Sequence, residues 1–163
     1  MQEEVFLKTE FLLQTNFSVY LTIAAADMDN DGDLDVLSTS RGSGVSGSVN
    51  LHRNDGSMGF TSETIDDFNM SGANSVFAAD FDGDGDNDVV AATRDGSGVI
   101  KWYENDGLGN FVTHIIVQGY NGVQKLFATD MDSDGHIDIV GVNMNTDEVF
   151  GIRTMEMATS HSM

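Results

Sequence analysis

Apolar and polar residues alternate along this chain in short stretches that recur about every 50 residues. Three of these stretches place two apolar residues on one face of an extended segment: Val49 and Leu51, Ile100 and Trp102, and Phe150 and Ile152. A period of two residues is typical of a β-strand with one packed face. Similar apolar segments lie at residues 60–65, 75–79, 111–116 and 124–128. The pattern therefore predicts an all-β chain of short strands.

Each repeat contains four of these strands, placed around an acidic stretch. Strand A precedes the acidic stretch, strand B follows it, and strands C and D come next. Asn-Asp-Gly at 54–56 and at 105–107 supplies a turn between strands C and D. Four strands in a repeat of about 50 residues are typical of a β-propeller blade.

The repeats divide the chain into three units, at about residues 5–55, 56–106 and 107–153, each in the order D-A-B-C. Residues 6–12 resemble the later D strands, so the first strand can complete a blade that the last three strands begin. Three blades are fewer than the usual four to eight. The chain is therefore either a segment of a larger propeller or a ring completed by oligomerisation, such as six blades from two chains. Residues 154–163 carry no pattern and are expected to form a disordered tail.

The acidic stretches read DMDNDGDLD at 27–35, DFDGDGDND at 80–88 and DMDSDGHID at 130–138. All three have aspartate at positions 1, 3, 5 and 9 and glycine at position 6. Carboxylate oxygens at this spacing, with a backbone carbonyl near position 7, suit a hard cation such as Ca²⁺. An EF-hand needs an acid at position 12 and flanking helices, but Ser38, Ala91 and Gly141 stand there and the following residues have no helical period.

Composition narrows the classes of partner. The 27 acidic against 7 basic residues give a net charge of −20, which three Ca²⁺ ions would reduce only in part. This charge argues against nucleic acid and anionic membranes. No apolar run is long enough to span a bilayer, and residues 1–4 lack the order of a signal peptide. The absence of cysteine excludes disulfides and thiol chemistry.

The acidic loops, the apolar strands after them and the WYENDG stretch at 102–107 resemble the FG-GAP/VCBS repeat family, over roughly residues 5–153. The resemblance implies a β-propeller, similar to integrin α-subunit heads, with one Ca²⁺ in the A-B loop of each blade. It also implies an extracellular or cell-surface location and a role in adhesion or carbohydrate binding. Carried over by position, the side-chain ligands are Asp27, Asp29, Asp31 and Asp35; Asp80, Asp82, Asp84 and Asp88; and Asp130, Asp132, Asp134 and Asp138. Asp33, Asp86 and His136 at position 7 would contribute backbone carbonyls.

We interpret the chain as a non-enzymatic, Ca²⁺-stabilised binding module with no catalytic residues. A catalytic ion keeps an open coordination position, whereas the protein here supplies every expected ligand. The four histidines, His52, His114, His136 and His161, do not recur between the repeats, and none has a paired acid or nucleophile at a meaningful spacing in the sequence. Trp102 is expected in the core, because Leu51 and Ile152 are taken as its counterparts. Alternatives are an accessory domain of a secreted polysaccharide-degrading enzyme and a purely structural fragment.

A glycan or protein ligand would bind on the rim opposite the metal loops. The B-C hairpins and D-A linkers form that rim at residues 41–48, 67–74, 94–98, 118–121 and 143–147. Phe68, Arg94 and Tyr120 are the candidate recognition residues. Residues 42–48 form a longer B-C loop than the second unit has, and the sequence leaves its role open.

Overall fold

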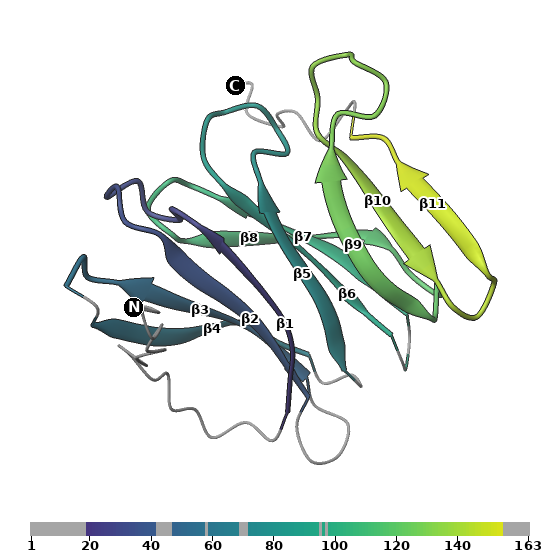
Figure 1. Cartoon of the computed structure of the whole chain (residues 1–163), viewed down its shortest axis with the longest axis horizontal. Helices are drawn as coiled ribbons and strands as arrows, with labels where there is room; N and C mark the ends of the chain where they lie inside the picture. The colour runs from purple at the N-terminus through teal and green to yellow at the C-terminus, as the bar shows by residue number, and fades with distance from the viewer. Residues whose placement is uncertain are drawn as a thin grey trace, which may run out of the picture.

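The computed structural model describes residues 19–41, 47–57, 59–68, 72–94, 96 and 98–154. These residues form β-strands and no helix (Figure 1). The strands are β1 (Val19–Ala26), β2 (Asp35–Arg41), β3 (Gly47–Asn54), β4 (Phe60–Phe68), β5 (Ala73–Ala79), β6 (Asp88–Thr93), β7 (Ile100–Asn105), β8 (Phe111–Val117), β9 (Val123–Thr129), β10 (Asp138–Asn143) and β11 (Glu148–Ile152). The prediction of an all-β chain is confirmed.

The strands form three antiparallel sheets in which chain neighbours pair. The first blade is β1-β2-β3-β4, the second is β5-β6-β7-β8, and the third contains β9-β10-β11. Each blade thus takes strands A, B and C from one sequence unit and strand D, where the structure describes one, from the next. The three sheets are consistent with propeller blades and do not close into a ring within the described residues (Figure 1).

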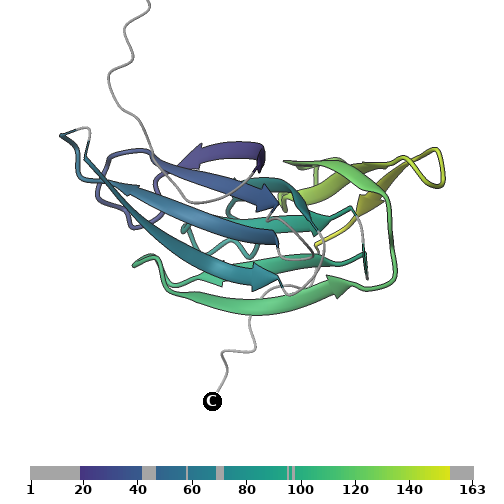
Figure 2. The same cartoon turned by 90° about the horizontal axis from the view of Figure 1, so that it is seen from below.

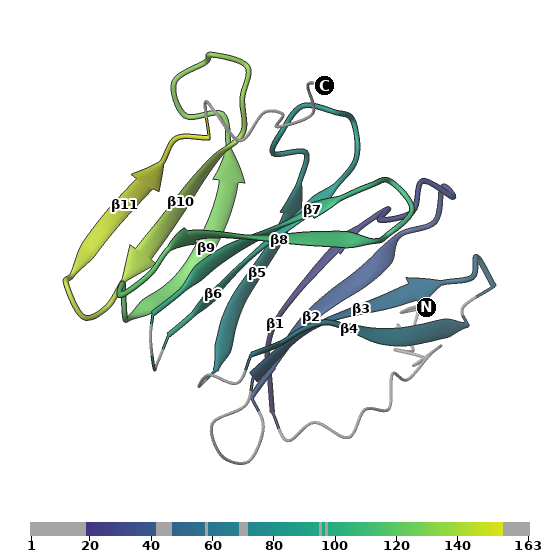
Figure 3. The same cartoon turned by 180° about the vertical axis from the view of Figure 1, so that it is seen from behind.

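Neighbouring blades pack against each other through buried side chains, and Figure 2 shows the three sheets from below. The A strands β1, β5 and β9 lie side by side, with β5 in contact with both of the others. The D strands β4 and β8 lie at the opposite edges of their sheets, as the view from behind shows (Figure 3). This arrangement brings the loops after the three A strands to one edge of the molecule, uppermost in Figure 1.

Apolar side chains fill the two spaces between the blades. Between the first and second blades, Leu37 and Leu51 pack with Val89 and Tyr103, all fully buried. Between the second and third blades, Trp102 and Ile100 pack with Leu126 and Ile139. The second blade is therefore packed on both faces: Val89 and Tyr103 face the first blade, whereas Ile100 and Trp102 face the third. The prediction that Trp102 belongs to the core is confirmed, with 4% of it exposed.

The strand register corrects the predicted equivalence in the third unit. Trp102 pairs with Val90 and Leu51 pairs with Leu37, each two residues after the last aspartate of its loop. In the third blade the residue two after Asp138 pairs with Gly151, not Ile152. Gly151 is therefore the counterpart of Trp102. Comparison of the apolar residues selected Ile152 because Phe150 and Ile152, the larger side chains of β11, lie on one face of the strand and Gly151 lies on the other.

The predicted division into two rims is confirmed in the described residues. On the rim away from the acidic loops, backbone hydrogen bonds join D-A linkers to B-C loops: Tyr120 N donates to Gly98 O at 2.9 Å, and Gly122 N donates to Arg94 O at 2.8 Å. On the other rim, Asn30 of the first acidic loop reaches Gly107 in the C-D turn of the second blade. On each rim, hydrogen bonds therefore join loops of neighbouring blades.

The predicted strand at residues 6–12 lies outside the described residues, as does most of residues 42–48. The predicted tail needs one correction. Thr154 is 2% exposed and hydrogen-bonded to the third acidic loop, so it belongs to the third blade rather than to a disordered tail. The described residues contain no long apolar helix of the kind that crosses a bilayer.

Candidate metal centres in the A-B loops

The three acidic loops share one backbone conformation. The glycine at position 6 has a positive φ in each loop, +93° at Gly32, +100° at Gly85 and +93° at Gly135. Glycine at position 6 suits this turn, since other residues rarely adopt such values. Position 4 also has a positive φ in every loop, at Asn30, Gly83 and Ser133, and this second turn was not predicted. The two turns curl each loop around its own aspartates.

The aspartate at position 1 accepts hydrogen bonds from the backbone of its own loop. Asp27 Oδ2 accepts from Gly32 N at 2.9 Å, and Asp80 Oδ2 accepts from Gly85 N at 3.1 Å. Asp130 Oδ2 accepts from Gly135 N at 3.0 Å in the third loop. These bonds close each loop and fix the first carboxylate without a metal.

The aspartate at position 9 is buried and connects two parts of its blade. One oxygen of Asp88 accepts from Phe81 N at position 2 (3.2 Å), and the other accepts from Asn105 N at the end of strand C (2.8 Å). Asp35 makes the same pair of bonds with Met28 N and Asn54 N. Asp138 repeats them with Met131 N and Thr154 N. Position 9 therefore joins the acidic loop to strand C in every blade.

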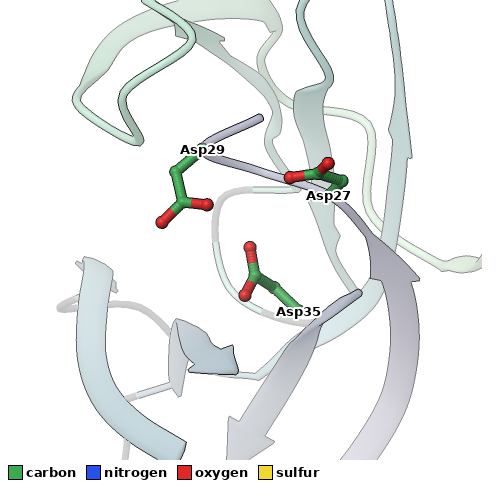
Figure 4. A group of neighbouring side chains, drawn as sticks. All are labelled: Asp27, Asp29 and Asp35. Atoms are coloured by element: carbon green, nitrogen blue, oxygen red, sulfur yellow. The ribbon is translucent and has the colours of Figure 1, made fainter. Parts of the chain in front are cut away.

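Positions 1, 3 and 9 converge in each loop. One carboxylate oxygen from each of Asp27, Asp29 and Asp35 lies within 4.8 Å of the others, and Figure 4 shows the three carboxylates around a common space. The same holds for Asp80, Asp82 and Asp88, and for Asp130, Asp132 and Asp138. Opposite ligands of a Ca²⁺ ion are about 5 Å apart, twice the Ca–O distance. Each group could therefore hold a metal ion.

Two oxygen atoms in the first loop fit a bound cation. Asp27 Oδ1 and Asp29 Oδ1 are enclosed, and neither has a hydrogen-bond partner. A buried carboxylate oxygen without a partner is costly, and a cation removes that cost. All the candidate ligand atoms are carboxylate oxygens, which hard divalent cations prefer.

Position 5 lies outside the converging groups. Asp31, Asp84 and Asp134 each accept a hydrogen bond at 2.9 Å from the backbone N–H of position 7. At position 7 itself, Asp86 accepts from Asn30 Nδ2 at 2.7 Å and links two neighbouring loops. The ligand roles assigned to positions 5 and 7 stay predictions.

Burial shapes the electrostatics of the loops. It raises the pKa of Asp88 to about 7, against the lowering effect of the Asn105 and Phe81 N–H groups. Burial also raises the pKa of Asp35 and of Asp82, and the nearby carboxylate charges add to both shifts. In the absence of a cation, these carboxylates are held in a setting that disfavours their charge.

A polar residue at the end of strand C completes each site, and sequence reasoning missed it. Asn54 Nδ2, Asn105 Nδ2 and Thr154 Oγ1 each donate to the carbonyl of position 8 in their own loop. Asn105 Nδ2 also donates to Met28 O in the loop of the first blade at 2.8 Å. The recurrence of Asn-Asp-Gly was the available signal, but it indicated a turn rather than a contact to the acidic loop.

The residue just before that position faces the aspartate at position 3 of the loop. Arg53 Nη1 lies 3.0 Å from Asp29 Oδ2, and Arg153 Nη2 lies 2.5 Å from Asp132 Oδ2. In the second blade Glu104 stands at this place and pairs with His114 at 2.7 Å. The three sites thus differ in charge next to otherwise similar loops.

The histidines of the described residues differ in their surroundings. His52 is 1% exposed and bonded to Ser38 Oγ at 2.8 Å and Ser62 Oγ at 2.7 Å, and burial lowers its pKa. His114 stacks on Trp102 with ring centroids 4.5 Å apart. His136 is exposed on its loop, and His161 lies outside the described residues.

The candidate recognition residues on the opposite rim have mixed surroundings. Tyr120 is half-buried, packs edge-on against Phe150 at 5.0 Å and donates to Glu148 Oε2 at 3.2 Å. Arg94 lies in the B-C loop of the second blade, and its carbonyl accepts from Gly122 N. The side chain of Phe68 lies outside the described part of the structure.

A sequence profile described as an FG-GAP-like repeat matches residues 27–91 and, in a second, overlapping match, residues 80–141. The matches begin at the first aspartates of the first and second acidic loops, and together they span more than half of the 163 residues. A search of curated proteins finds no match to the chain. On the strength of the repeat profile and the recurring blades, the chain belongs to the family of FG-GAP-like repeat proteins.

Proposed function

We propose that this chain is a non-enzymatic Ca²⁺-binding module of β-propeller blades that serves in extracellular ligand binding or adhesion. The observation that carries the proposal is the threefold recurrence of three converging carboxylates, one group in each blade. When bound, Ca²⁺ would supply the positive charge that these loops lack. Asp27, Asp29 and Asp35, with their counterparts in the other two loops, would hold it.

The donor set supports Ca²⁺ over other ions. Zinc and copper favour nitrogen or sulfur ligands, and the converging groups offer carboxylate oxygen alone. Mg²⁺ demands shorter bonds and near-octahedral geometry, whereas Ca²⁺ tolerates flexible sets of six to eight oxygens. Ion sites of extracellular modules often bind at about 10⁻⁴ to 10⁻³ M, so we expect weak binding.

A structural role for the ion follows from where the ligands come from. Position 9 is bonded to strand C, and positions 1 and 3 lie at the end of strand A. A cation bound by all three would tie strands A, B and C together and relieve the repulsion among the carboxylates. The ion would then stabilise each blade rather than take part in a reaction.

The test is equilibrium Ca²⁺ binding together with thermal melting in Ca²⁺, in Mg²⁺ and in chelator. We expect about three Ca²⁺ per chain and a higher melting temperature in Ca²⁺. The double variant Asp27→Asn with Asp29→Asn should bind one ion fewer, because it removes two carboxylates from one group. The control is Asp147→Asn, an exposed aspartate outside all three groups. Absence of any response to millimolar Ca²⁺ would refute the proposal.

The ligand would bind on the rim that carries Tyr120 and Arg94. Its loops are hydrogen-bonded across blades, which supports a defined surface there. Binding to a glycan array by the isolated chain, weakened by Tyr120→Ala or Arg94→Ala, is the expected result. Unchanged affinity in both variants for every bound glycan would exclude these residues as the recognition site.

The third blade suggests how the chain assembles. Strand β11 forms an edge of its sheet in the described residues, and Val149 on it is 76% exposed. Such an edge invites another strand. We propose that it is covered in a larger propeller or by a second copy. Light scattering distinguishes the two: a mass of two chains indicates a ring of two copies, and a monomer indicates a segment of a longer propeller.

A further inference from the structure

One place near the end of strand C can be compared between the three blades; in the third blade it lies just after β11. Asn54, Asn105 and Thr154 each donate a backbone N–H to the position 9 aspartate of their own loop. They therefore occupy equivalent places, although the third blade has threonine there. The residues just before them are Arg53, Glu104 and Arg153. Two blades therefore carry a cation, and one carries an anion, at the same place.

In the first and third blades this residue pairs with the position 3 aspartate. Arg53 is 24% exposed and contacts Asp29 and also Glu63, at 3.0 Å and 2.7 Å. Arg153 is 64% exposed and contacts Asp132. Both guanidinium groups bind a carboxylate oxygen that belongs to a candidate metal ligand. A metal ion at these loops meets a carboxylate that is already partly neutralised.

In the second blade the charge is reversed. Glu104 and Asp82 line one cavity of about 490 Å³, together with Asp84 and Asp106. The corresponding cavity beside the third loop is about 240 Å³ and is lined by Arg153 and Asp132. The second loop therefore combines an open cavity with an added negative charge.

The charge surrounding the three sites differs accordingly. The second loop has five aspartates and Glu104, whose partner is His114; the first has five aspartates and Arg53, which also pairs with Glu63. The third has Arg153 and four aspartates, because histidine replaces aspartate at position 7. The electrostatic attraction for a divalent cation should follow this order.

We propose that the residue at this place on strand C grades the three loops, so that the Glu104 loop takes up Ca²⁺ first and the Arg153 loop last. The proposal rests on the Ca²⁺ function proposed above. Arg53 and Arg153 act as built-in counter-charges that a metal must outcompete, and Glu104 adds attraction. At 0.15 M salt, removal of one such charge should change the affinity of its own loop by roughly threefold to tenfold.

Trp102 provides a reporter for the second loop. It is the only tryptophan, it lies two residues before Glu104 on β7, and its ring stacks on His114, which pairs with Glu104 at 2.7 Å. Trp102 fluorescence during a Ca²⁺ titration should therefore follow the second loop, while a competing chelator dye reports total binding. We expect the midpoint of the fluorescence change to fall at a lower free Ca²⁺ concentration than the midpoint of total binding.

Single-loop variants measure each site directly, even if the fluorescence of Trp102 is silent. In each variant the aspartates at positions 1 and 3 of the other two loops are replaced by asparagine, with circular dichroism to confirm the fold. We expect the second loop to bind roughly tenfold or more tightly than the third, with the first between them. The substitution Glu104→Gln should weaken only the second loop, and Arg153→Gln should strengthen only the third.

Matched controls remove the same charges elsewhere. Lys125→Gln on β9 removes a positive charge whose Nζ contacts Thr22 Oγ1. Glu148→Gln removes a negative charge at the start of β11, on the opposite rim. Neither control should change any constant more than twofold. A third loop that binds as tightly as the second, or controls that act as strongly as Glu104→Gln, would overturn the grading while leaving Ca²⁺ binding intact. Absence of Ca²⁺ binding in every variant would overturn both.

Discussion

Replacement of Asn105 by alanine should be among the most damaging changes to the fold, because one amide joins two blades. Asn105 is 2% exposed. Its Nδ2 donates to Met28 O and to Asn87 O, both at 2.8 Å, and its Oδ1 accepts from Gly109 N at 3.0 Å. The two carbonyls belong to the acidic loops of the first and second blades. Alanine would leave three backbone groups without their partner.

The cost follows from these three bonds. A hydrogen bond contributes about 1 kcal/mol net, and a buried group left unpaired costs more, so we expect Asn105→Ala to lose about 3 to 4 kcal/mol. Asn54 is the matched control on β3. Its amide contacts Leu34 O and Gly56 N, both at 3.2 Å and both exposed, so water can replace it. Asn54→Ala should lose about 0.5 to 1 kcal/mol.

Urea unfolding at fixed Ca²⁺ measures the difference. With a slope of about 2 kcal/mol per molar urea, Asn105→Ala should lower the midpoint by about 1.5 to 2 M. Asn105→Thr keeps one donor, as Thr154 does in the third blade, and should fall between wild type and alanine. Equal losses for Asn105→Ala and Asn54→Ala would refute the argument that the buried Asn105 amide contributes more to stability than the exposed Asn54 amide.

Three further predictions concern individual residues. Because the folded, metal-free protein raises the pKa of Asp88 to about 7, it holds this proton more tightly than the unfolded chain does. The contribution of Asp88 to stability is therefore present below about pH 4 and falls by roughly 4 kcal/mol as the pH rises to 7. Unfolding in chelator at several pH values should show a smaller slope in Asp88→Asn than in the wild type, with the remainder due to Asp35 and Asp82, and an unchanged slope would contradict the assignment. Gly98→Ala should destabilise at least twice as much as Gly85→Ala in thermal melting, because both have positive φ but a Cβ at Gly98 would lie 2.3 Å from a backbone nitrogen of the next linker. Tyr103→Phe should cost about 1.5 kcal/mol in urea unfolding, since the buried hydroxyl donates to Asp66 Oδ2 at 2.9 Å; no loss would mean that the bond adds nothing to stability.

The sequence predicted the repeating features of this fold well. Aspartates at fixed spacing and glycine at position 6 identified the loops, because a cation and a positive φ each restrict which residues can stand there. Strand alternation and the repeat length identified the blades. These signals depend on residues close together in the chain, which can be compared directly from one repeat to the next.

Contacts between distant residues were not predictable in the same way. The bond from Asn105 to Met28 spans 77 residues, and neither residue type implies the other. Thr154 was assigned to a tail because threonine does not resemble the asparagine of the other repeats, although its hydroxyl makes the same contact. The shift of Ile152 by one residue had a related cause: strand C of the third repeat has its large side chains on the other face, so hydrophobicity alone gave the wrong register.

The link between the acidic loop and strand C depends on the position 9 aspartate, whereas the candidate metal site also needs positions 1 and 3. The position 9 carboxylate holds strand C through two backbone N–H groups, whereas positions 1 and 3 supply the remaining oxygens to the shared space. A repeat without its first and third aspartates would lose the candidate metal group and the bond that closes its loop, but it would keep the two bonds from position 9. Metal binding, where the proposed sites hold an ion, could therefore be gained or lost one repeat at a time. A designer could vary it in the same way, with the architecture of the neighbouring blades left intact.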